Sequence, residues 1–466
     1  MNKNTIIIFI ISFFISSCSS VMPEWVGGED DDVKMEGKRI SVLAHSTKIK
    51  RDADHKSIKI LLPNKSKNES WVLQRISSVE HPEFISTKPS ILTQVSIGEE
   101  PEDGLRLTSS PIVANGKVIT LDASGKIQAR DIRNIENIYW EVELSTPSMA
   151  SDSLLTLGLT SGRTNKDFLG GNIVYDNNMV FATTAFGMVY ALDIKDGKIK
   201  WSRSVEIPIK STSVVSNNKI YFTTSKNKLY AINQNDGKTL WTYSGISEIT
   251  SIYGASGPSI SEDGKIVVVP YSSGELLAIN AENGKPLWSE VLTGGSGSNS
   301  SIYSLNDIDA TPIISKGKVY AVSSDGVLTS LDLNTGKRLW TKDISSVQTP
   351  WISGDFLYIL TSNNELLCIN APDGRIKWIG QFPKHSTPLV SWSDDDRGDT
   401  ISWSGPVLAG GKLFVTGSHG RMAIVSPYSG KIIDALEITE NIYLPPIVVN
   451  SRMYILSNES ELVALK

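Results

Sequence analysis

Two acidic residues, Asp307 and Asp309, stand one residue apart in the stretch SLNDIDATP. Residues i and i+2 of an extended chain project to the same face, roughly 6.5–7 Å apart. Such a pair could act in general acid–base catalysis or supply half of a metal site. Catalysis needs further groups that converge on the same point, and the sequence offers none near the pair. We therefore expect neither aspartate to be catalytic.

Other residues that could do chemistry are scattered. The five histidines show neither an i,i+4 pair nor the spacing of metal ligands, and they are His45, His55, His81, His385 and His419. His419, within GSHGRM, is interpreted as a polar turn residue. The run Asp394-Asp395-Asp396 is interpreted as a solvated loop rather than a calcium site. The sequence therefore predicts no catalytic residue, no metal site and no cofactor.

Composition and charge narrow the class of protein. The 466 residues are 40% hydrophobic and 20% charged, which is typical of a folded chain. The net charge of −5 gives no electrostatic basis for binding nucleic acid, which favours a basic face. We expect partners other than nucleic acid.

The chain begins with the pattern of a lipoprotein signal peptide. Lys3 is followed by an apolar run over residues 6–15, which is too short to span a bilayer. Ile15-Ser16-Ser17-Cys18 resembles a bacterial lipobox, so we expect residues 1–17 to be removed and Cys18 to be lipidated; the alternative is an ordinary signal peptide. Ser19 in place of aspartate favours the outer membrane, with the protein facing the periplasm.

Residues 18–70 are polar and charged and include the acidic run 29–32, so they predict a flexible tether that carries the lipid. Cys368, the second cysteine, lies in an apolar strand pattern. It is predicted to be a buried, inert thiol.

An internal repeat governs the remainder of the chain. Five segments align without a gap, namely ALDIKDGKIKW (191–201), AINQNDGKTLW (231–241), AINAENGKPLW (278–288), SLDLNTGKRLW (330–340) and CINAPDGRIKW (368–378). A degraded copy ends at Trp140, and another has Asp434 where tryptophan is expected. Each copy combines an alternating strand, an Asp/Asn-Gly type turn that favours a tight hairpin, and a large ring to bury. The copies predict strand hairpins that share one structure.

Two further short strands precede each hairpin, and four strands per 40–50 residues is the period of a β-propeller blade. Seven hairpins are counted, at Trp140, Trp201, Trp241, Trp288, Trp340, Trp378 and Asp434. An eighth blade begins at Pro445 and has three strands before Lys466. We expect its outer strand to come from ESWVLQRI around Trp71. Residues 71–466 therefore predict an all-β, eight-bladed propeller closed by strands from both termini, with seven blades as the alternative.

The repeated hairpin resembles the quinoprotein propeller repeat, which is shared by two functional classes. One class contains dehydrogenases that carry pyrroloquinoline quinone (PQQ) and calcium. The other is the BamB-type lipoprotein, a non-catalytic scaffold of the outer-membrane β-barrel assembly machine. Cys18, the tether and the blade count look like the BamB type, and NDIDATP is similar to a motif of that family.

The resemblance implies binding sites for BamA, the barrel-inserting subunit. It places them on the loop with Asp307 and Asp309 and on the preceding loop, over residues 250–254. Thr250, Ile252 and Tyr253 are the candidates there, and Tyr253 stands where the family has arginine, a bidentate hydrogen-bonding anchor. We expect Asp307 to lie further out on its loop and to favour docking, and Asp309 to act as a contact or as a structural brace.

The resemblance implies a scaffold that assists the insertion of outer-membrane proteins, with unfolded barrel proteins as possible clients. Two alternatives remain open at this point. One is a periplasmic PQQ-dependent dehydrogenase, although the sequence has no Cys-Cys pair to cover a quinone. The other is a generic propeller that binds a ligand such as a glycan.

Overall fold

The computed structural model describes residues 49–53, 59–72, 79–86, 88–144, 170–209, 211–245, 256–292, 307–386 and 399–466. These residues belong to one compact unit that starts at Ile49, separate from residues 1–48. They contain 32 strands and no α-helix. Nowhere in the described ranges is there an apolar helix of a length that would cross a bilayer. Cys18 lies outside the described residues.

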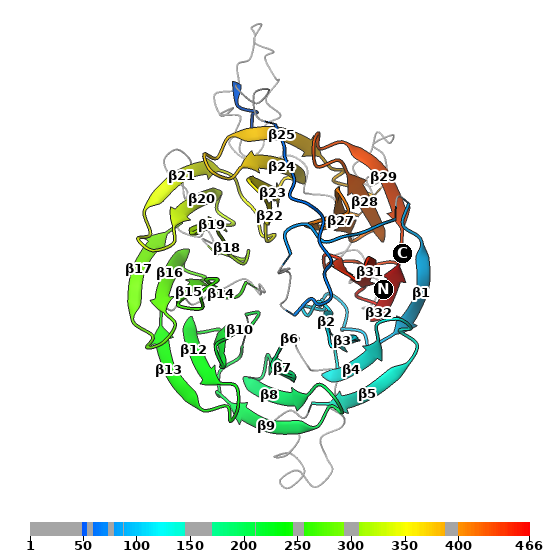
Figure 1. Cartoon of the computed structure of the whole chain (residues 1–466), viewed down its shortest axis with the longest axis vertical. Coiled ribbons are helices and arrows are strands. Elements are labelled where there is room, and N and C mark those ends of the chain that lie inside the picture. The colour runs from blue at the N-terminus through cyan, green and yellow to red at the C-terminus, as the bar shows by residue number, and fades with distance from the viewer. Residues whose placement is uncertain are drawn as a thin grey trace, which may run out of the picture. The chain divides into compact units, whose positions relative to one another are not determined.

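The strands form eight antiparallel sheets of four, arranged as an eight-bladed β-propeller (Figure 1). Blades one to four are β2 (Ile112–Ala114), β3 (Lys117–Leu121), β4 (Lys126–Asp131) and β5 (Ile138–Glu143); β6 (Gly171–Asp176), β7 (Met179–Thr184), β8 (Met188–Asp193) and β9 (Ile199–Ser204); β10 (Val214–Ser216), β11 (Lys219–Thr223), β12 (Lys228–Asn233) and β13 (Thr239–Ser244); β14 (Ser259–Ile260), β15 (Ile266–Pro270), β16 (Glu275–Asn280) and β17 (Pro286–Val291). Blades five to eight are β18 (Ile313–Ser315), β19 (Lys318–Val322), β20 (Val327–Asp332) and β21 (Arg338–Asp343); β22 (Trp351–Ser353), β23 (Phe356–Leu360), β24 (Glu365–Asn370) and β25 (Ile376–Gln381); β26 (Trp403–Ala409), β27 (Lys412–Gly417), β28 (Arg421–Val425) and β29 (Ile432–Glu437); β30 (Ile447–Val449), β31 (Arg452–Leu456), β32 (Glu461–Leu465) and β1 (Ile91–Ser96). The prediction of eight blades is confirmed.

The third blade shows why these sequences form blades. Asn217 and Asn218 both have positive φ, as the tight turn between β10 and β11 requires. In β11, Ile220 and Phe222 pack toward the second blade, whereas Tyr221 packs toward the fourth. Both faces of the middle strands are therefore buried, which is why their sequences are apolar at successive positions.

The repeat tryptophans join each blade to the next. In six blades the outer strand carries a tryptophan whose indole N–H donates a hydrogen bond of 2.8 to 3.3 Å to a backbone carbonyl of the following blade. The pairs are Trp140 with Ile194, Trp201 with Gln234, Trp241 with Ala281, Trp288 with Leu333, Trp340 with Ala371, and Trp378 with Pro427. The same rings lie against the turn glycines of the following blades. Each contact buries apolar area and satisfies a polar group.

The eighth blade is closed by β1, which pairs with β32. The expectation that the closing strand comes from the N-terminal side is confirmed, but the segment around Trp71 is the wrong one. Trp71 instead pairs with Val113 of β2 through two backbone hydrogen bonds of 2.8 Å and stacks on Trp351. Trp71 is therefore not one of the repeat tryptophans.

Residues 59–72 and 79–86, which we call the strap, lie against one end of four blades (Figure 1). The sequence assigned residues 59–70 to the flexible tether. Strap residues hydrogen-bond to the propeller in the pairs Glu80 with Gly354, Pro82 with Gly410, Asn68 with Asn450 and Trp71 with Val113. Three of these partners lie in turns between the first and second strands of blades six, seven and eight. The strap therefore contacts blades six to eight and blade one, which lie on the two sides of the point where the ring closes.

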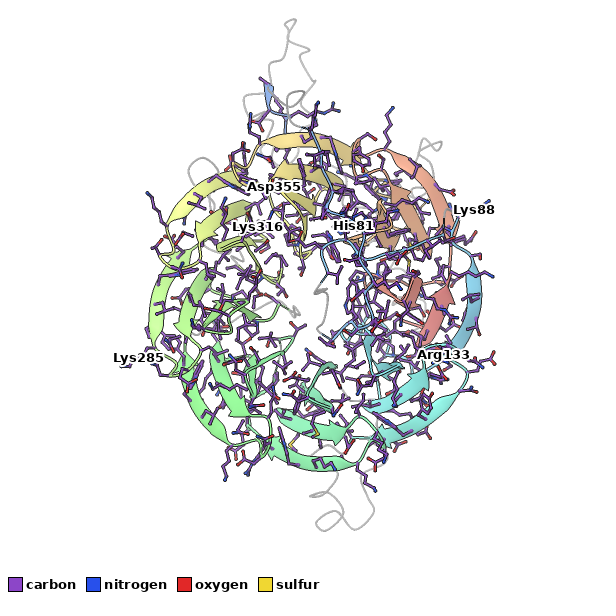
Figure 2. The ribbon with its side chains drawn as sticks, in the orientation of Figure 1. His81, Lys88, Arg133, Lys285, Lys316 and Asp355 are labelled. Carbon is purple, nitrogen blue, oxygen red and sulfur yellow. The ribbon has the colours of Figure 1, made fainter. Side chains whose placement is uncertain are left out.

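His81 pins the strap to the seventh blade (Figure 2). Its ring lies 2.7 Å from the carbonyl oxygen of Pro63, and its Nε2 accepts a hydrogen bond of 2.9 Å from the N–H of Gly411. Burial lowers the pKa of His81; the Pro63 carbonyl opposes this shift and nearby Lys65 adds to it. The neutral ring with the proton on Nδ1 satisfies both partners.

Cys368 is a free, fully buried thiol in β24, as predicted. Burial raises the pKa of this thiol well above its ordinary value. The thiol is therefore held in its unreactive protonated form.

Candidate functional site

The segment Asp307–Pro312 enters the fifth blade immediately before β18. Asp307 is only 3% exposed and Asp309 only 6%. The sequence predicted Asp307 to lie further out, but both are buried. The carbonyl of Asp307 accepts hydrogen bonds from the N–H and hydroxyl of Ser324, at 3.0 and 2.8 Å. This end of the segment is fixed to the turn between β19 and β20.

The rest of the segment bridges three blades. The hydroxyl of Ser256 and the N–H of Gly257, both ahead of the fourth blade, donate to the carbonyl of Ala310 and the hydroxyl of Thr311. The N–H of Thr311 donates in turn to the hydroxyl of Thr349, ahead of the sixth blade, at 3.2 Å. The segment therefore holds neighbouring blades in register, and Asp309 projects from a fixed backbone.

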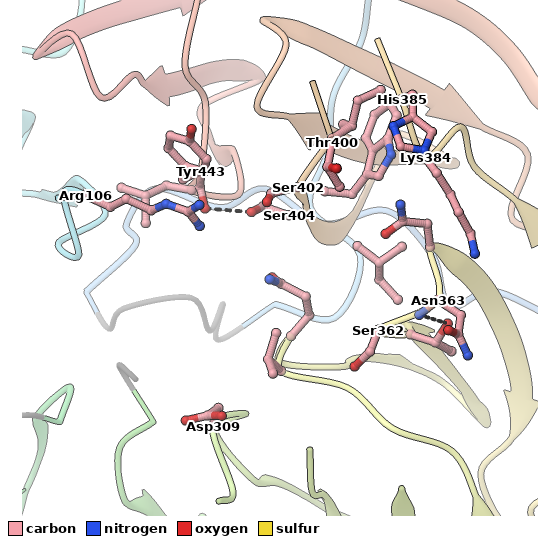
Figure 3. Close-up of a pocket in the computed structure, with 18 of the residues that line it drawn as sticks. Arg106, Asp309, Ser362, Asn363, Lys384, His385, Thr400, Ser402, Ser404 and Tyr443 are labelled. Carbon is pink, nitrogen blue, oxygen red and sulfur yellow. Dashed lines mark hydrogen bonds between the residues drawn. The ribbon is translucent and has the colours of Figure 1, made fainter. Parts of the chain in front are cut away.

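Asp309 lines a cavity of about 660 Å³ at the end of the propeller opposite the strap (Figure 3). The cavity is bounded mainly by residues between blades and by the turn that joins β23 to β24. Its described polar lining includes Arg106, Asn363, Lys384, His385, Ser402 and Tyr443. Figure 3 shows Asp309 across the opening from most of these side chains. Among the described lining residues Asp309 is the one carboxylate, whereas Arg106 and Lys384 are cationic.

The polar groups of the cavity are held in place by their neighbours. The Arg106 guanidinium lies over the Tyr443 ring at 4.0 Å, and the Ser404 hydroxyl donates to the Tyr443 carbonyl at 2.6 Å. Nδ1 of His385 is buried, and none of the described residues forms a hydrogen bond with it. The described lining of the cavity therefore offers two cations, one carboxylate, one imidazole nitrogen and several amide and hydroxyl groups to a bound molecule.

His419 is explained by packing rather than by chemistry. Its ring packs edge-on against Trp403, with the centroids 5.0 Å apart. Burial, followed by the charge of Arg421, lowers the pKa of His419. His419 lies in the turn between β27 and β28, as interpreted from the sequence, and its ring packs on the aromatic side chain of Trp403.

The described residues do not fit a calcium–quinone centre. Calcium takes six to eight oxygen ligands, which commonly include carboxylates. Within the described ranges no three His, Cys, Asp or Glu side chains gather as metal ligands would. Asp309 is the only carboxylate that the described residues contribute to the cavity.

Three predicted contact residues, Thr250, Ile252 and Tyr253, lie outside the described residues. The described chain stops at Gly245 and resumes at Ser256, beside Asp309 and its neighbours. The cavity residues Arg106, Lys384, His385 and Tyr443 were missed because they lie in interblade segments of unequal length. No repeat spacing marks such positions.

The ring of eight four-stranded blades, with tryptophans on the outer strands, defines the class of quinoprotein-type propellers. A family model described as outer membrane protein assembly factor BamB matches residues 136–380, more than half of the chain. The chain belongs to this family.

Curated relatives agree with this membership, and solved structures agree with the fold. The outer membrane protein assembly factor BamB of Salmonella typhimurium is 30% identical, with 76% of this chain and 83% of the relative covered. The Escherichia coli protein of that name is 28% identical over the same shares. Among solved structures, BamB from Moraxella catarrhalis superposes with a TM-score of 0.64 at 20% identity, over 81% of this chain and 100% of the other.

A europium-containing methanol dehydrogenase also superposes, with a TM-score of 0.61 at 14% identity, over 85% of this chain and 98% of the other. At this identity the likeness concerns the fold alone. The shared fold therefore gives no argument for dehydrogenase activity.

Proposed function

We propose that this chain is a lipid-anchored scaffold of the machinery that assembles β-barrel proteins in the outer membrane. In this proposal Cys18 carries the lipid, and the propeller faces the periplasm. The observation that carries the proposal is membership of the BamB family, whose relatives are named as outer membrane protein assembly factors. The chain acts by binding, and it carries out no reaction of its own.

The partner in this proposal is the barrel-inserting subunit, BamA. It docks on the interblade loops of blades three to five, which bear Thr250, Ile252, Tyr253, Asp307 and Asp309. Loops on a rigid scaffold commonly carry recognition. The hydrogen bonds that fix Ala310 and Thr311 between three blades support a preorganised surface, which costs little ordering entropy on binding.

The surroundings of the two aspartates support different roles for them. The Asp307 backbone is held by Ser324, whereas the Asp309 side chain reaches a cavity open to solvent. We therefore assign the polar contact to Asp309 and the bracing of the loop mainly to Asp307. Tyr253 supplies a stiff amphipathic anchor in place of the arginine that the family pattern carries.

A binding assay with the purified inserter subunit tests this function. Tyr253→Ala and the near-isosteric Asp309→Asn should each weaken capture by about tenfold, the loss expected for an interface anchor. Glu262→Arg is the matched control, because Glu262 is exposed in the turn between β14 and β15, at the other end of the fourth blade. Equal capture by all three variants and the parent would refute the docking assignment.

A further inference from the structure

The chain binds a segment of itself on the outer rim of the sixth blade. Residues 49–53 lie beside the outer edge of β25, at the upper rim in Figure 1. The N–H of Asp52 donates to the carbonyl of Ile376 at 3.3 Å, and the N–H of Ile376 donates to the Asp52 carboxylate at 2.7 Å. Nζ of Lys342, on the fifth blade, lies 3.5 Å from the same carboxylate. The Asp52 carboxylate thus accepts a hydrogen bond from the edge strand β25 and also lies beside the cation of Lys342.

The segment also covers apolar surface. Ile49 packs against the cluster that contains Ile376, which is 4% exposed. Isoleucines at the matching position of other blades, two residues before the tryptophan position, are 44% exposed at Ile138, Ile199 and Ile432. The rim groove between two blades can therefore hold an extended peptide through one aliphatic and one acidic side chain.

A groove of the same construction lies between the second and third blades. It has a volume of about 390 Å³ and lies among the end of β9, the hairpin turn and the start of β13; its lining includes Arg203, Val205, Ile232, Lys238 and Thr239. Arg203 follows Trp201 by two residues, as Lys342 follows Trp340. Thr239 pairs with Ile232 as Ile376 pairs with Ile369, so its N–H and carbonyl face outward in the same way.

The cation of this groove is positioned over the turn. A Cβ built on Gly237 would lie 2.7 Å from Cγ of Arg203, so the arginine stem rests on the glycine. Lys238 is paired with Asp236 at 3.1 Å, whereas Arg203 forms no ion pair within the described part of the chain. A guanidinium at this place can receive a carboxylate in two parallel hydrogen bonds.

Five other blade junctions lack this combination. The residues two places after the tryptophan position there are Val142, Tyr243, Glu290, Gly380 and Leu436. Between blades four and five, Arg338 pairs with Glu290 at 3.0 Å. Between blades three and four, Pro286 has no N–H to donate. Of the seven junctions whose outer strands carry the repeat position, the one between blades two and three thus repeats the chemistry of the occupied groove.

We propose that the groove between blades two and three binds an extended segment of another protein that has an aliphatic residue followed three positions later by an acidic one. The aliphatic side chain packs beside Val205. The carboxylate binds Arg203 and the backbone N–H of Thr239, as Asp52 binds Lys342 and Ile376. This site lies on the rim and is independent of the loops proposed to bind the inserter.

The test uses the full chain in detergent and a fluorescent peptide with the sequence of residues 46–54, STKIKRDAD. Fluorescence anisotropy should show saturable binding, which Arg203→Glu weakens by at least about tenfold. The peptide with asparagine at the position of Asp52 should be weakened similarly. Lys285→Glu, an exposed cation on the rim of the fourth blade (Figure 2), should leave the affinity within about twofold.

Lys342→Glu separates the two grooves, because it alters only the one filled by the chain itself. The proposal expects its affinity for the peptide to equal that of the parent. It is overturned if the parent shows no saturable binding up to about 1 mM, or if Arg203→Glu binds as the parent does. Loss of binding on Lys342→Glu would also overturn it, since the peptide would then be exchanging with residues 49–53.

Discussion

Trp340 of the fifth blade lies over Gly374 of the sixth, and its indole N–H donates a hydrogen bond of 2.8 Å to the carbonyl of Ala371. A Cβ added to Gly374 would lie 2.7 Å from Cδ2 of Trp340. The glycine is thus required for the approach of the ring as well as for its φ of +74°. Because five other junctions repeat this contact, it is the unit from which the ring is built.

Gly374→Ala should lower the free energy of unfolding by more than the positive φ of this residue alone explains. Gly317→Ala is the matched control, since Gly317 has a φ of +71° and nothing within 4 Å of the added Cβ. We expect Gly317→Ala to lower the free energy of unfolding by about 1 kcal/mol. Gly374→Ala should lower it by about 1–3 kcal/mol more, because the indole must shift. Equal losses in urea unfolding would contradict the account of the blade junction.

His81 should make stability depend on pH. Its pKa in the folded protein lies below the ordinary value of about 6.5 because the ring is buried. The unfolded chain therefore binds the proton first as the pH falls. The stability that His81 contributes is complete above about pH 6.5 and decreases below it, toward the folded pKa. Protonation of Nε2 would also remove the acceptor of the Gly411 N–H.

His81→Gln isolates this effect, because glutamine offers a donor and an acceptor but does not titrate. The difference in free energy of unfolding between parent and variant should be smaller at about pH 5.5 than at about pH 7.5. His419 is present in both proteins, so its titration cancels. A difference that is constant across this range would show that His81 does not titrate as the strap geometry requires.

Asp52 should protect the backbone amide of Ile376, at the outer edge of the sixth blade, from hydrogen exchange. The Ile376 amide donates to the Asp52 carboxylate at 2.7 Å, so Asp52→Ala should speed its hydrogen exchange by about tenfold or more. Lys50→Ala, an exposed neighbour, should leave it unchanged. Exchange that is equally slow in Asp52→Ala would mean that residues 49–53 do not cover this edge.

The blades were predictable because each repeat buries the same positions. A tight turn, a mostly apolar strand and a ring packed on the next turn recur at Trp201, Trp241, Trp288, Trp340 and Trp378. The strands were predicted to bury every second side chain, but β8 and β12 bury successive ones because another blade covers each face. Even the degraded copy at Trp140 keeps the hydrogen bond to the following blade. At these positions the residues of the repeated motif are the ones that pack between blades. The number of motif copies therefore gives the number of these blades.

The strap and the cavity were not predictable in this way. Trp71 was assigned by residue type to an outer strand, yet it packs beside Val113 and Trp351. Its neighbours come from distant parts of the chain, and a strap that crosses turns has no periodicity to detect. Asp309 was found by its motif, whereas Arg106 and Tyr443 line the same cavity only because the ring closes.

Crosslinking in the native envelope tests the central claim, that this propeller acts by docking on a barrel-inserting subunit, most directly. A photoreactive residue is placed at Tyr253 and, for comparison, at Glu262 at the other end of the fourth blade. The account predicts a crosslink to the inserter from Tyr253 and none from Glu262. A crosslink from Glu262 alone, or none from either position with both proteins at native levels, would contradict it.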